Sequence, residues 1–268
     1  MPIFAGNWKL QKNPAQTRAF FKEFVARSGD LKLKSEGNAS LSAAQAAKPG
    51  MVKPPENVVV FFPPAPCWEA SAESLKDSPI QWGGQNIYIQ NSGAFTGENS
   101  PQTLAEMGAK FALVGHSERR QLFHEGDDFL SMKVNALQSL GLTPVLCIGE
   151  SLSQRENKET ETVLLHQLTK GLEKASKEKP IIIAYEPVWA IGTGKVATED
   201  QVRDAHLFIE GKLRHLGFQK IPILYGGSVK AENSKGLLKI PHVDGFLVGG
   251  ASLDVDSFLA ICRSNLHA

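Results

Sequence analysis

The sequence predicts an α/β protein folded as a closed (β/α)₈ barrel in a single domain, residues 1–268, and three observations support this prediction. Eight short apolar runs recur along the chain, each preceded by a proline or polar residue and followed by a glycine or polar residue. Segments with helical apolar periodicity separate the runs. A chain of 268 residues has the length that eight strand–helix pairs require. The periodicity alone leaves an open, doubly wound sheet as a competing fold.

The eight apolar runs have the composition of strands that are buried on both faces. They are rich in Val, Ile, Leu and Phe and lack the alternation of a half-exposed strand. A proline at the first residue of a strand is compatible with a sheet, because its missing N–H lies at the end of the ladder. The runs begin at Pro2, Asn57, Ile80, Lys110, Thr143, Pro180, Ile221 and Val243.

Helix signals occupy the segments between the runs. Asn13 followed by Pro14 is an N-cap followed by a proline in the first helical turn. Thr198 with Gln201 three residues later forms a capping box, so a second helix is expected to start there. The apolar stripe of this second helix ends at a glycine and consists of Val202, Ala205, Ile209, Leu213 and Leu216, before Gly217.

Residues 30–56, between the first helix and the second strand, break the regular spacing. They are rich in Ser, Ala, Lys, Pro and Gly, and we expect them to form a surface insertion. Connections from helix to strand lie on the face of a barrel away from catalysis. The insertion is therefore predicted to be catalytically neutral.

Composition excludes several classes of function. The net charge of +1 gives no support for nucleic-acid binding or for a polybasic membrane surface, although a local anion site remains open. Cys67, Cys147 and Cys262 are far apart, which argues against a disulfide framework or a zinc site and favours a reducing compartment. No signal-peptide pattern and no membrane-spanning apolar run is present. We expect a cytoplasmic protein.

The stretch IIIAYEPVWAIGTGK, residues 181–195, predicts a general base beside a lid. Glu186 stands where the apolar run ends, and Pro187 stops the strand. An unusually apolar loop follows, with a glycine-rich centre that allows close backbone approach. A solvated glutamate before a long connection is the alternative. The predicted lid consists of Pro187, Val188, Trp189, Ala190, Ile191, Gly192, Thr193, Gly194 and Lys195.

Polar residues also follow the other predicted strands, and a barrel would bring them to one end. Taken singly, Lys9 is an ordinary surface lysine, His116 a structural histidine and each glycine pair a tight turn. Bare backbone N–H groups after the seventh and eighth strands, however, are the usual phosphate site of a barrel. The set comprises Asn7, Lys9, Gln85, Asn86, His116, Ser117, Glu118, Glu150, Ser228, Gly249 and Gly250.

Four motifs in this order resemble the triosephosphate isomerase family over nearly the whole chain. They are GNWK at residues 6–9, GHSERR at 115–120, YEPVWAIGTGK at 185–195, and YGGSV at 225–229 with VGG at 248–250. The resemblance implies a TIM barrel that interconverts dihydroxyacetone phosphate and D-glyceraldehyde 3-phosphate, in glycolysis and gluconeogenesis. It implies no cofactor and no metal.

The resemblance also implies a role for each site residue. Glu186 would shuttle a proton between two carbons, and burial under Ile191 and its neighbours would raise its basicity once water is excluded. Neutral His116 would polarise the carbonyl and handle the hydroxyl protons, while Lys9 with Asn7 would stabilise the enediolate. Phosphate would bind to Gly192, Ser228, Gly249 and Gly250. Ser117, Glu118 and Thr96 would have supporting roles.

The loop from Asn86 to Glu98 resembles the family's dimer arm, which implies a homodimer. Thr96 would then reach the Asn7, Lys9 and His116 of a second copy. A loose excursion is the alternative, but Phe95 and its apolar neighbours are unfavourable to expose. The chain departs from the family pattern at Val196, where a threonine is expected at the second hinge of the lid, and at residues 89–92 of the arm.

Two other functions compete with this interpretation. The first is another barrel enzyme that acts on a sugar phosphate, such as an aldolase or an epimerase. A Schiff-base aldolase needs a lysine inside the barrel, whereas Lys9 lies on a loop, and the seven histidines are too scattered for a metal-dependent enzyme. The second is an inactive barrel retained for binding, which loss of Glu186, His116 or Lys9 would indicate; all three are present.

Overall fold

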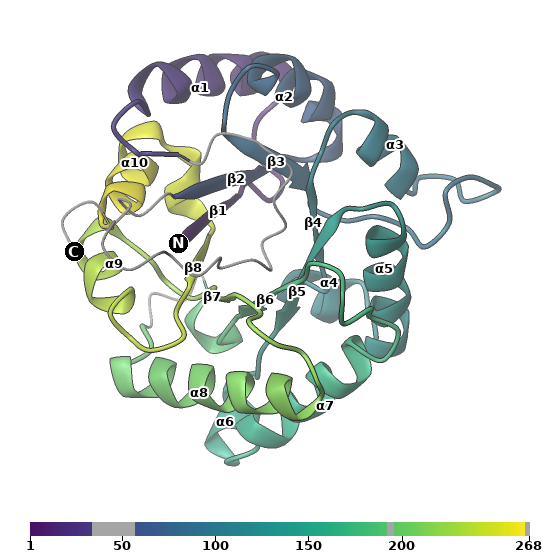
Figure 1. Cartoon of the computed structure of the whole chain (residues 1–268), viewed down its shortest axis with the longest axis vertical. Coiled ribbons are helices and arrows are strands. Elements are labelled where there is room, and N and C mark those ends of the chain that lie inside the picture. Colours follow the sequence, from purple (N-terminus) through teal and green to yellow (C-terminus); the bar gives the residue numbers. More distant parts are fainter. Residues whose placement is uncertain (34–56, 192–195, 266–268) are drawn as a thin grey trace, which may run out of the picture.

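The computed structural model describes residues 1–33, 57–191 and 196–265, and within them eight parallel strands close into a barrel (Figure 1). The strands follow one another around the barrel in chain order, and the first pairs with the last. This closure confirms the predicted (β/α)₈ barrel and rules out the open sheet. The strands are β1 (Ile3–Asn7), β2 (Val58–Phe62), β3 (Gln81–Gly84), β4 (Phe111–Val114), β5 (Thr143–Ile148), β6 (Ile182–Tyr185), β7 (Ile223–Tyr225) and β8 (Gly245–Val248).

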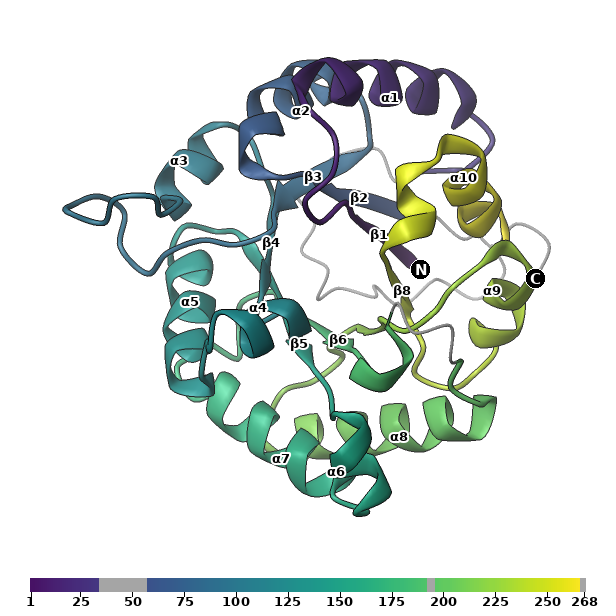
Figure 2. The same ribbon diagram turned by 180° about the vertical axis from the view of Figure 1, so that it is seen from behind.

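Helices form a ring outside the strands (Figures 1 and 2). They are α1 (Pro14–Arg27), α2 (Trp68–Leu75), α3 (Pro101–Glu106), α4 (Ser117–Leu122), α5 (Asp127–Ser139), α6 (Leu152–Glu156), α7 (Thr160–Gly171), α8 (Glu199–His215), α9 (Ala231–Leu237) and α10 (Val255–Arg263). Three 3₁₀ turns complete the described elements: η1 (Ala65–Cys67), η2 (Val188–Ala190) and η3 (Gly250–Leu253). None of the helices in these described ranges has the length and apolar character needed to cross a bilayer.

Alternate residues of each strand face two separate apolar layers. In β1, Ile3 and Ala5 belong to the cluster that fills the barrel, whereas Phe4 belongs to the layer between strands and helices. Both sides of each strand are therefore buried, which explains the continuous apolar runs in the sequence. Polar side chains next to the strands therefore stand mainly beyond the strand ends.

The helix signals in the sequence correspond to observed caps. Asn13 caps α1 in a capping box with Gln16, and Thr198 caps α8 in a capping box with Gln201. The predicted stripe of α8 is buried except for its last member, Leu216, which is partly exposed. These caps fix the starts of α1 and α8, and with them the loops that lead back to the strand ends.

Most of the predicted insertion, residues 34–56, lies outside the described residues. The residues that flank this segment are joined to each other, since Leu33 forms a β-bridge with Asn57. The Asn57 side chain donates to the Leu31 carbonyl, and its backbone N–H donates to the Lys32 carbonyl. This junction precedes β2, so it lies at the amino ends of the strands.

Candidate active site

A cavity of about 260 Å³ lies at the carboxyl ends of the strands and brings most of the predicted site residues together. Side chains from β1, β4 and β6 meet on one side of it, and the loops after β7 and β8 form the other. The predicted residues that line it are Asn7, Lys9, His116, Glu186, Ser228, Gly249 and Gly250, together with the lid residues Ala190 and Ile191. Residues distant in the sequence thus share one cavity, as the barrel prediction required.

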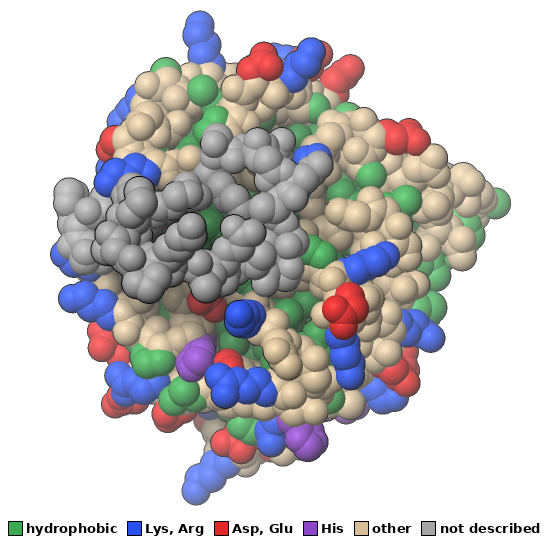
Figure 3. All heavy atoms as spheres, in the orientation of Figure 1, with side chains coloured by type: hydrophobic (Ala, Val, Ile, Leu, Met, Phe, Trp, Pro, Cys, Tyr) green, Lys and Arg blue, Asp and Glu red, His purple; other side chains and the backbone are tan. Residues whose placement is uncertain are grey.

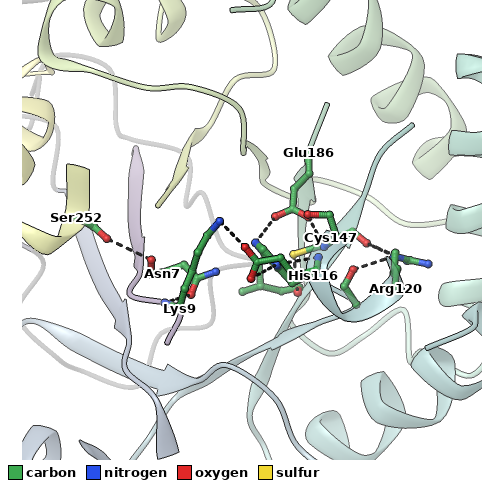
Figure 4. A network of polar contacts seen from close by, with 11 residues as sticks. Asn7, Lys9, His116, Arg120, Cys147, Glu186 and Ser252 are labelled. Carbon is green, nitrogen blue, oxygen red and sulfur yellow. Dashed lines mark hydrogen bonds and ion pairs between the residues drawn. The ribbon is translucent and has the colours of Figure 1, made fainter. Parts of the chain in front are cut away.

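Glu186 is held at the end of β6 by both its backbone and its carboxylate. Its backbone N–H donates to the Ile148 carbonyl on β5 at 2.7 Å. One carboxylate oxygen, Oε1, lies 3.0 Å from His116 Nε2, and the other, Oε2, accepts the Ser117 N–H at 2.8 Å (Figure 4). Glu186 is 2% exposed. These two contacts direct the carboxylate toward the start of α4.

His116 is the N-cap of α4, and its ring is oriented by that helix. Its Nδ1 accepts the Glu118 backbone N–H at 3.3 Å. A nitrogen that accepts a hydrogen bond carries no proton, so this contact favours the ring with its proton on Nε2. That proton then points at Glu186 and into the cavity.

The pKa values of this pair differ from the sequence prediction. Burial raises the pKa of Glu186, but His116, the Ser117 N–H and Lys9 outweigh it and leave that pKa below its ordinary value. Burial lowers the pKa of His116, but the Glu186 carboxylate outweighs it and leaves that pKa raised. The expected directions were the reverse. The physical reason is the direct contact of the two groups, because each stabilises the charged form of the other.

Lys9 lies in the loop after β1 with a left-handed backbone, φ 53°. Its backbone N–H donates to Asn7 Oδ1 at 3.0 Å, and its carbonyl accepts from Gln85 Nε2 at 2.8 Å. Its ammonium contacts Glu118 Oε1 at 2.6 Å across the cavity mouth (Figure 4). Asn7 thus shapes the loop that directs Lys9, and Glu118 provides a counter-charge for it.

Glycines allow the backbone of neighbouring strands to pass close to Glu186. A Cβ atom on Gly149 would lie 1.7 Å from the Glu186 carbonyl oxygen. A Cβ atom on Gly226 would lie 2.9 Å from Glu186 Cγ. Only glycine fits at Gly149, and Gly226 leaves the Glu186 side chain room to move.

The described start of the predicted lid is anchored to a buried carboxylate. Glu150, fully buried, accepts hydrogen bonds from Trp189 Nε1 at 2.9 Å and from the Tyr185 hydroxyl. Arg155 pairs with Glu150 at 2.9 Å and lies over the Trp189 ring. The sequence placed Glu150 at a strand end without a role. Glu150 directly follows Gly149, where the chain after β5 packs closely against Glu186, and this close packing explains why Glu150 is buried.

The loops after β7 and β8 complete the cavity. The Ser228 hydroxyl donates to the Ala190 carbonyl at 2.9 Å, which joins the β7 loop to η2. Lys230 also lines the cavity, and the sequence prediction missed it although it directly follows the YGGSV motif. The remaining lid residues, Gly192, Thr193, Gly194 and Lys195, lie outside the described residues.

Three predicted supporting residues do not line the cavity in the described chain. Ser117 acts through its backbone N–H, and Glu118 acts through Lys9. Thr96 is exposed on the arm. Within the residues that the structure describes, no three His, Cys, Asp or Glu side chains are grouped so as to hold a metal ion.

Comparisons with known proteins agree with this geometry. The family model for triosephosphate isomerase matches residues 27–265. The chain is 52% identical to the triosephosphate isomerase of Bdellovibrio bacteriovorus, over 97% of this chain and 98% of that one. It is 42% identical to the Chlamydia muridarum enzyme, over 96% and 89% of the two chains.

A solved structure gives the same result. The crystal structure of triosephosphate isomerase from Bartonella henselae matches with a TM-score of 0.81 and 34% identity, over 98% of each chain. Motifs, cavity and relatives over nearly the full length lead to one conclusion: the chain belongs to the triosephosphate isomerase family.

Proposed function

We infer that the protein interconverts dihydroxyacetone phosphate and D-glyceraldehyde 3-phosphate through an enediolate. The observation that carries this inference is the meeting of Glu186, His116 and Lys9 around one cavity in a chain of this family. A carboxylate base, a hydrogen-bond donor and a cation are what proton transfer next to a carbonyl requires. This reaction is a step of glycolysis and of gluconeogenesis.

Each residue has a proposed step. The C–H bond next to a carbonyl is weakly acidic, so Glu186 takes its proton only if the developing negative charge is stabilised. His116 Nε2–H donates to the carbonyl oxygen, and Lys9 with Asn7 stabilises the enediolate. His116 is proposed to carry the proton of the neighbouring hydroxyl to the former carbonyl oxygen, so that the two oxygens exchange roles. Glu186 returns its proton to the neighbouring carbon, which completes the aldose–ketose exchange.

Substrate binding is proposed to activate the base by breaking the contact between His116 and Glu186. A substrate whose oxygens take the His116 proton would separate His116 from Glu186. Without that contact, burial raises the pKa of Glu186 and lowers the pKa of His116. Both groups then shift toward the states that the reaction needs, a basic carboxylate and a neutral imidazole.

The phosphate is proposed to bind at the loops after β7 and β8. Ser228, Gly249 and Gly250 line this side of the cavity, opposite Glu186. Backbone N–H groups of glycine-rich loops approach an anion without steric hindrance. Lys9 and Lys230 add positive charge. Gly192 remains a prediction, and in this proposal it brings the lid onto the phosphate and excludes water from the enediolate.

The test is an isomerase assay that compares the wild type with Glu186→Gln, with a chelator present throughout. We expect the substitution to lower kcat by about 10²–10⁴-fold, since it removes the base but keeps the size of the side chain. Glu73→Gln is the matched control, because Glu73 is exposed on α2 and pairs only with Arg18 among the described residues.

An equal rate in the Glu186→Gln variant would contradict the role of Glu186. Loss of wild-type activity with the chelator would instead indicate a metal-dependent enzyme. Absence of activity in the wild type itself would favour an inactive barrel used for binding.

We also propose that the protein is a homodimer through the arm, residues 86–98, which extends away from the barrel (Figures 1 and 2). Phe95 on the arm is 40% exposed, and apolar side chains lie along the arm in Figure 3. Leu10, in the loop after β1, and Leu122 and Phe123, at the end of α4, are 94%, 69% and 62% exposed. Burial of these side chains against a second copy would explain both features.

The base of the arm is firmly held, as an inserted element must be. Lys133 on α5 is 1% exposed and donates to Asn86 Oδ1 at 2.6 Å and to Glu125 Oε1 at 2.7 Å. Thr96 on the preformed arm would reach the cavity of the second copy. We further propose a cytoplasmic location, which suits three free, buried cysteines.

A further inference from the structure

The loop between β1 and α1 contains a second lysine with a left-handed backbone. Lys12 has φ 71°, as unfavourable for a residue with a Cβ as the conformation of Lys9. Its side chain is half-buried and lies against the protein. The ammonium lies 5.2 Å from the centre of the Trp8 ring and 4.7 Å from that of Phe20, and it donates to the Leu253 carbonyl at 2.9 Å.

The partner of Lys12 is the last residue of η3, Gly250–Leu253. The first residue of this 3₁₀ turn belongs to the glycine pair that faces the cavity. A second donor holds the same end of η3, since Trp8 Nε1 donates to the Ser252 carbonyl at 3.1 Å. The Ser252 hydroxyl in turn contacts the Gly249 carbonyl at 2.7 Å and the Asn7 carbonyl at 3.5 Å (Figure 4).

Two donors from the loop after β1 therefore hold the carbonyl end of η3. In a helical turn, the carbonyls point one way and the N–H groups the other. Fixing the carbonyl end orients the N–H end, which begins at Gly250 beside the cavity. A cation at the carbonyl end also complements the dipole of the turn.

We propose that Lys12 is a positioning residue that holds η3 so that the amides of Gly249 and Gly250 face the phosphate of the substrate. This inference rests on the proposed function, which places the phosphate there. Lys12 does not touch the substrate. It links the loop of Lys9, which stabilises the reacting end of the substrate, to the turn that binds the other end.

The test is steady-state kinetics and competitive inhibition by inorganic phosphate, for the wild type and for Lys12→Met. Methionine keeps an unbranched apolar side chain over Trp8 and Phe20 and removes the donor to Leu253. We expect KM and the inhibition constant for phosphate to rise together by about fivefold, the effect of one lost hydrogen bond, with kcat within about twofold. Lys12→Arg, which restores a donor, should recover most of the affinity.

Controls separate this role from general stability. Lys22→Met removes an exposed lysine from α1 and should change neither constant. Lys12→Gly removes the donor while relieving the left-handed backbone, so it is expected to fold and still to bind phosphate weakly. A lower melting temperature in Lys12→Met with unchanged phosphate inhibition overturns the inference and leaves the proposed function intact. Failure of phosphate to inhibit the wild type overturns the proposed phosphate site, and this inference with it.

Discussion

At the scale of single residues, the buried carboxylate of Glu186 depends on two neighbouring groups. Glu186 is bound by the His116 ring and the Ser117 N–H, and both contacts stabilise the carboxylate against taking up a proton. The contacts also provide hydrogen bonds to a buried charge. Without them, a carboxylate on a residue that is only 2% exposed would be strongly unfavourable. In the proposed mechanism, a substrate that takes the His116 proton removes one of these two contacts from the carboxylate.

Gly149→Ala is expected to destabilise the protein and disturb Glu186. The added Cβ would lie 1.7 Å from the Glu186 carbonyl oxygen, so the end of β6 must shift. We predict a loss of about 2–4 kcal/mol in the free energy of unfolding, with reduced kcat. Urea denaturation and the isomerase assay measure the two effects.

Gly211→Ala on α8 is the matched control. A Cβ there meets nothing within 4 Å, so we expect a gain of about 0.5–1 kcal/mol from the better helix former. Equal stabilities for the two alanine variants would contradict the close approach at Gly149.

His206 is expected to make stability depend on pH. It is fully buried, its Nδ1 contacts the His242 carbonyl at 2.8 Å, and burial lowers its pKa to about 4. The unfolded chain binds a proton below about pH 6.5, whereas the folded protein does not until about pH 4, so stability falls as pH drops through this window. Relative to pH 7, the loss at pH 5 should be about 2 kcal/mol.

Urea titrations of the wild type and His206→Asn at both pH values test this. Asparagine can keep a donor to the His242 carbonyl but does not titrate, so its loss between pH 7 and pH 5 should be smaller by that amount. The same pH dependence in both proteins would rule out His206 as the source.

The sequence could identify Glu186 but not its surroundings. Pro187 marks the end of a buried strand, so the position of the carboxylate follows from local chemistry. Its contact with His116 depends on how β4 and β6 are placed around the barrel, across β5, which no local pattern encodes. For this reason the sequence could name residues that line one cavity, but it could not give the directions in which their contact shifts the pKa values of Glu186 and His116.

At the scale of elements, the loops at the two ends of the strands differ in function. Those at the carboxyl ends contain Lys9, His116 and η2. Hydrogen bonds from neighbouring loops hold Lys9 and η2, whereas the Glu118 N–H of α4 holds His116. At the amino end of β2, the chain is closed by the pairing of Leu33 with Asn57. The sequence predicted the helix starts from the caps at Asn13 and Thr198. It did not predict the short turns η2 and η3, because three or four residues carry no periodicity.

Removal of residues 34–56, replaced by a short Gly/Ser linker, should leave turnover unchanged. Leu33 and Asn57 are already paired, so the linker closes a gap that the fold has fixed, and a shorter loop costs less entropy to close. We expect kcat and KM within about twofold of the wild type and equal or slightly greater stability. A large fall in kcat with normal thermal unfolding would show that the segment contributes to catalysis.

At the scale of the whole molecule, charged side chains and exposed apolar side chains are distributed differently over the surface. On the face in Figure 3, the acidic and basic side chains of the described residues are interspersed, in keeping with a net charge of +1. The exposed apolar side chains of the arm and of α4 lie at the side and the carboxyl end instead. The near-neutral net charge could be counted from the sequence, whereas the positions of the exposed apolar side chains could be known only from the fold.

Leu122→Glu is expected to weaken dimerisation. Leu122 is 69% exposed on α4, and a charge there would be buried in the proposed interface. We predict a loss of at least about 2 kcal/mol in association free energy, measured by sedimentation equilibrium, with lower activity at dilution. Leu207→Glu, 44% exposed on α8 away from the arm, is the control. A wild type that sediments as a monomer would exclude the proposed dimer.

The pairing of β1 with β8 has a consequence for how the protein is made. Ile3 must find Gly245, a neighbour that leaves the ribosome only after almost all of the chain has been synthesised. Until then, the growing sheet has two open edges that could pair with other chains. We therefore expect nascent fragments ending before β8 to depend on chaperones, a need that release of the final segment would abolish.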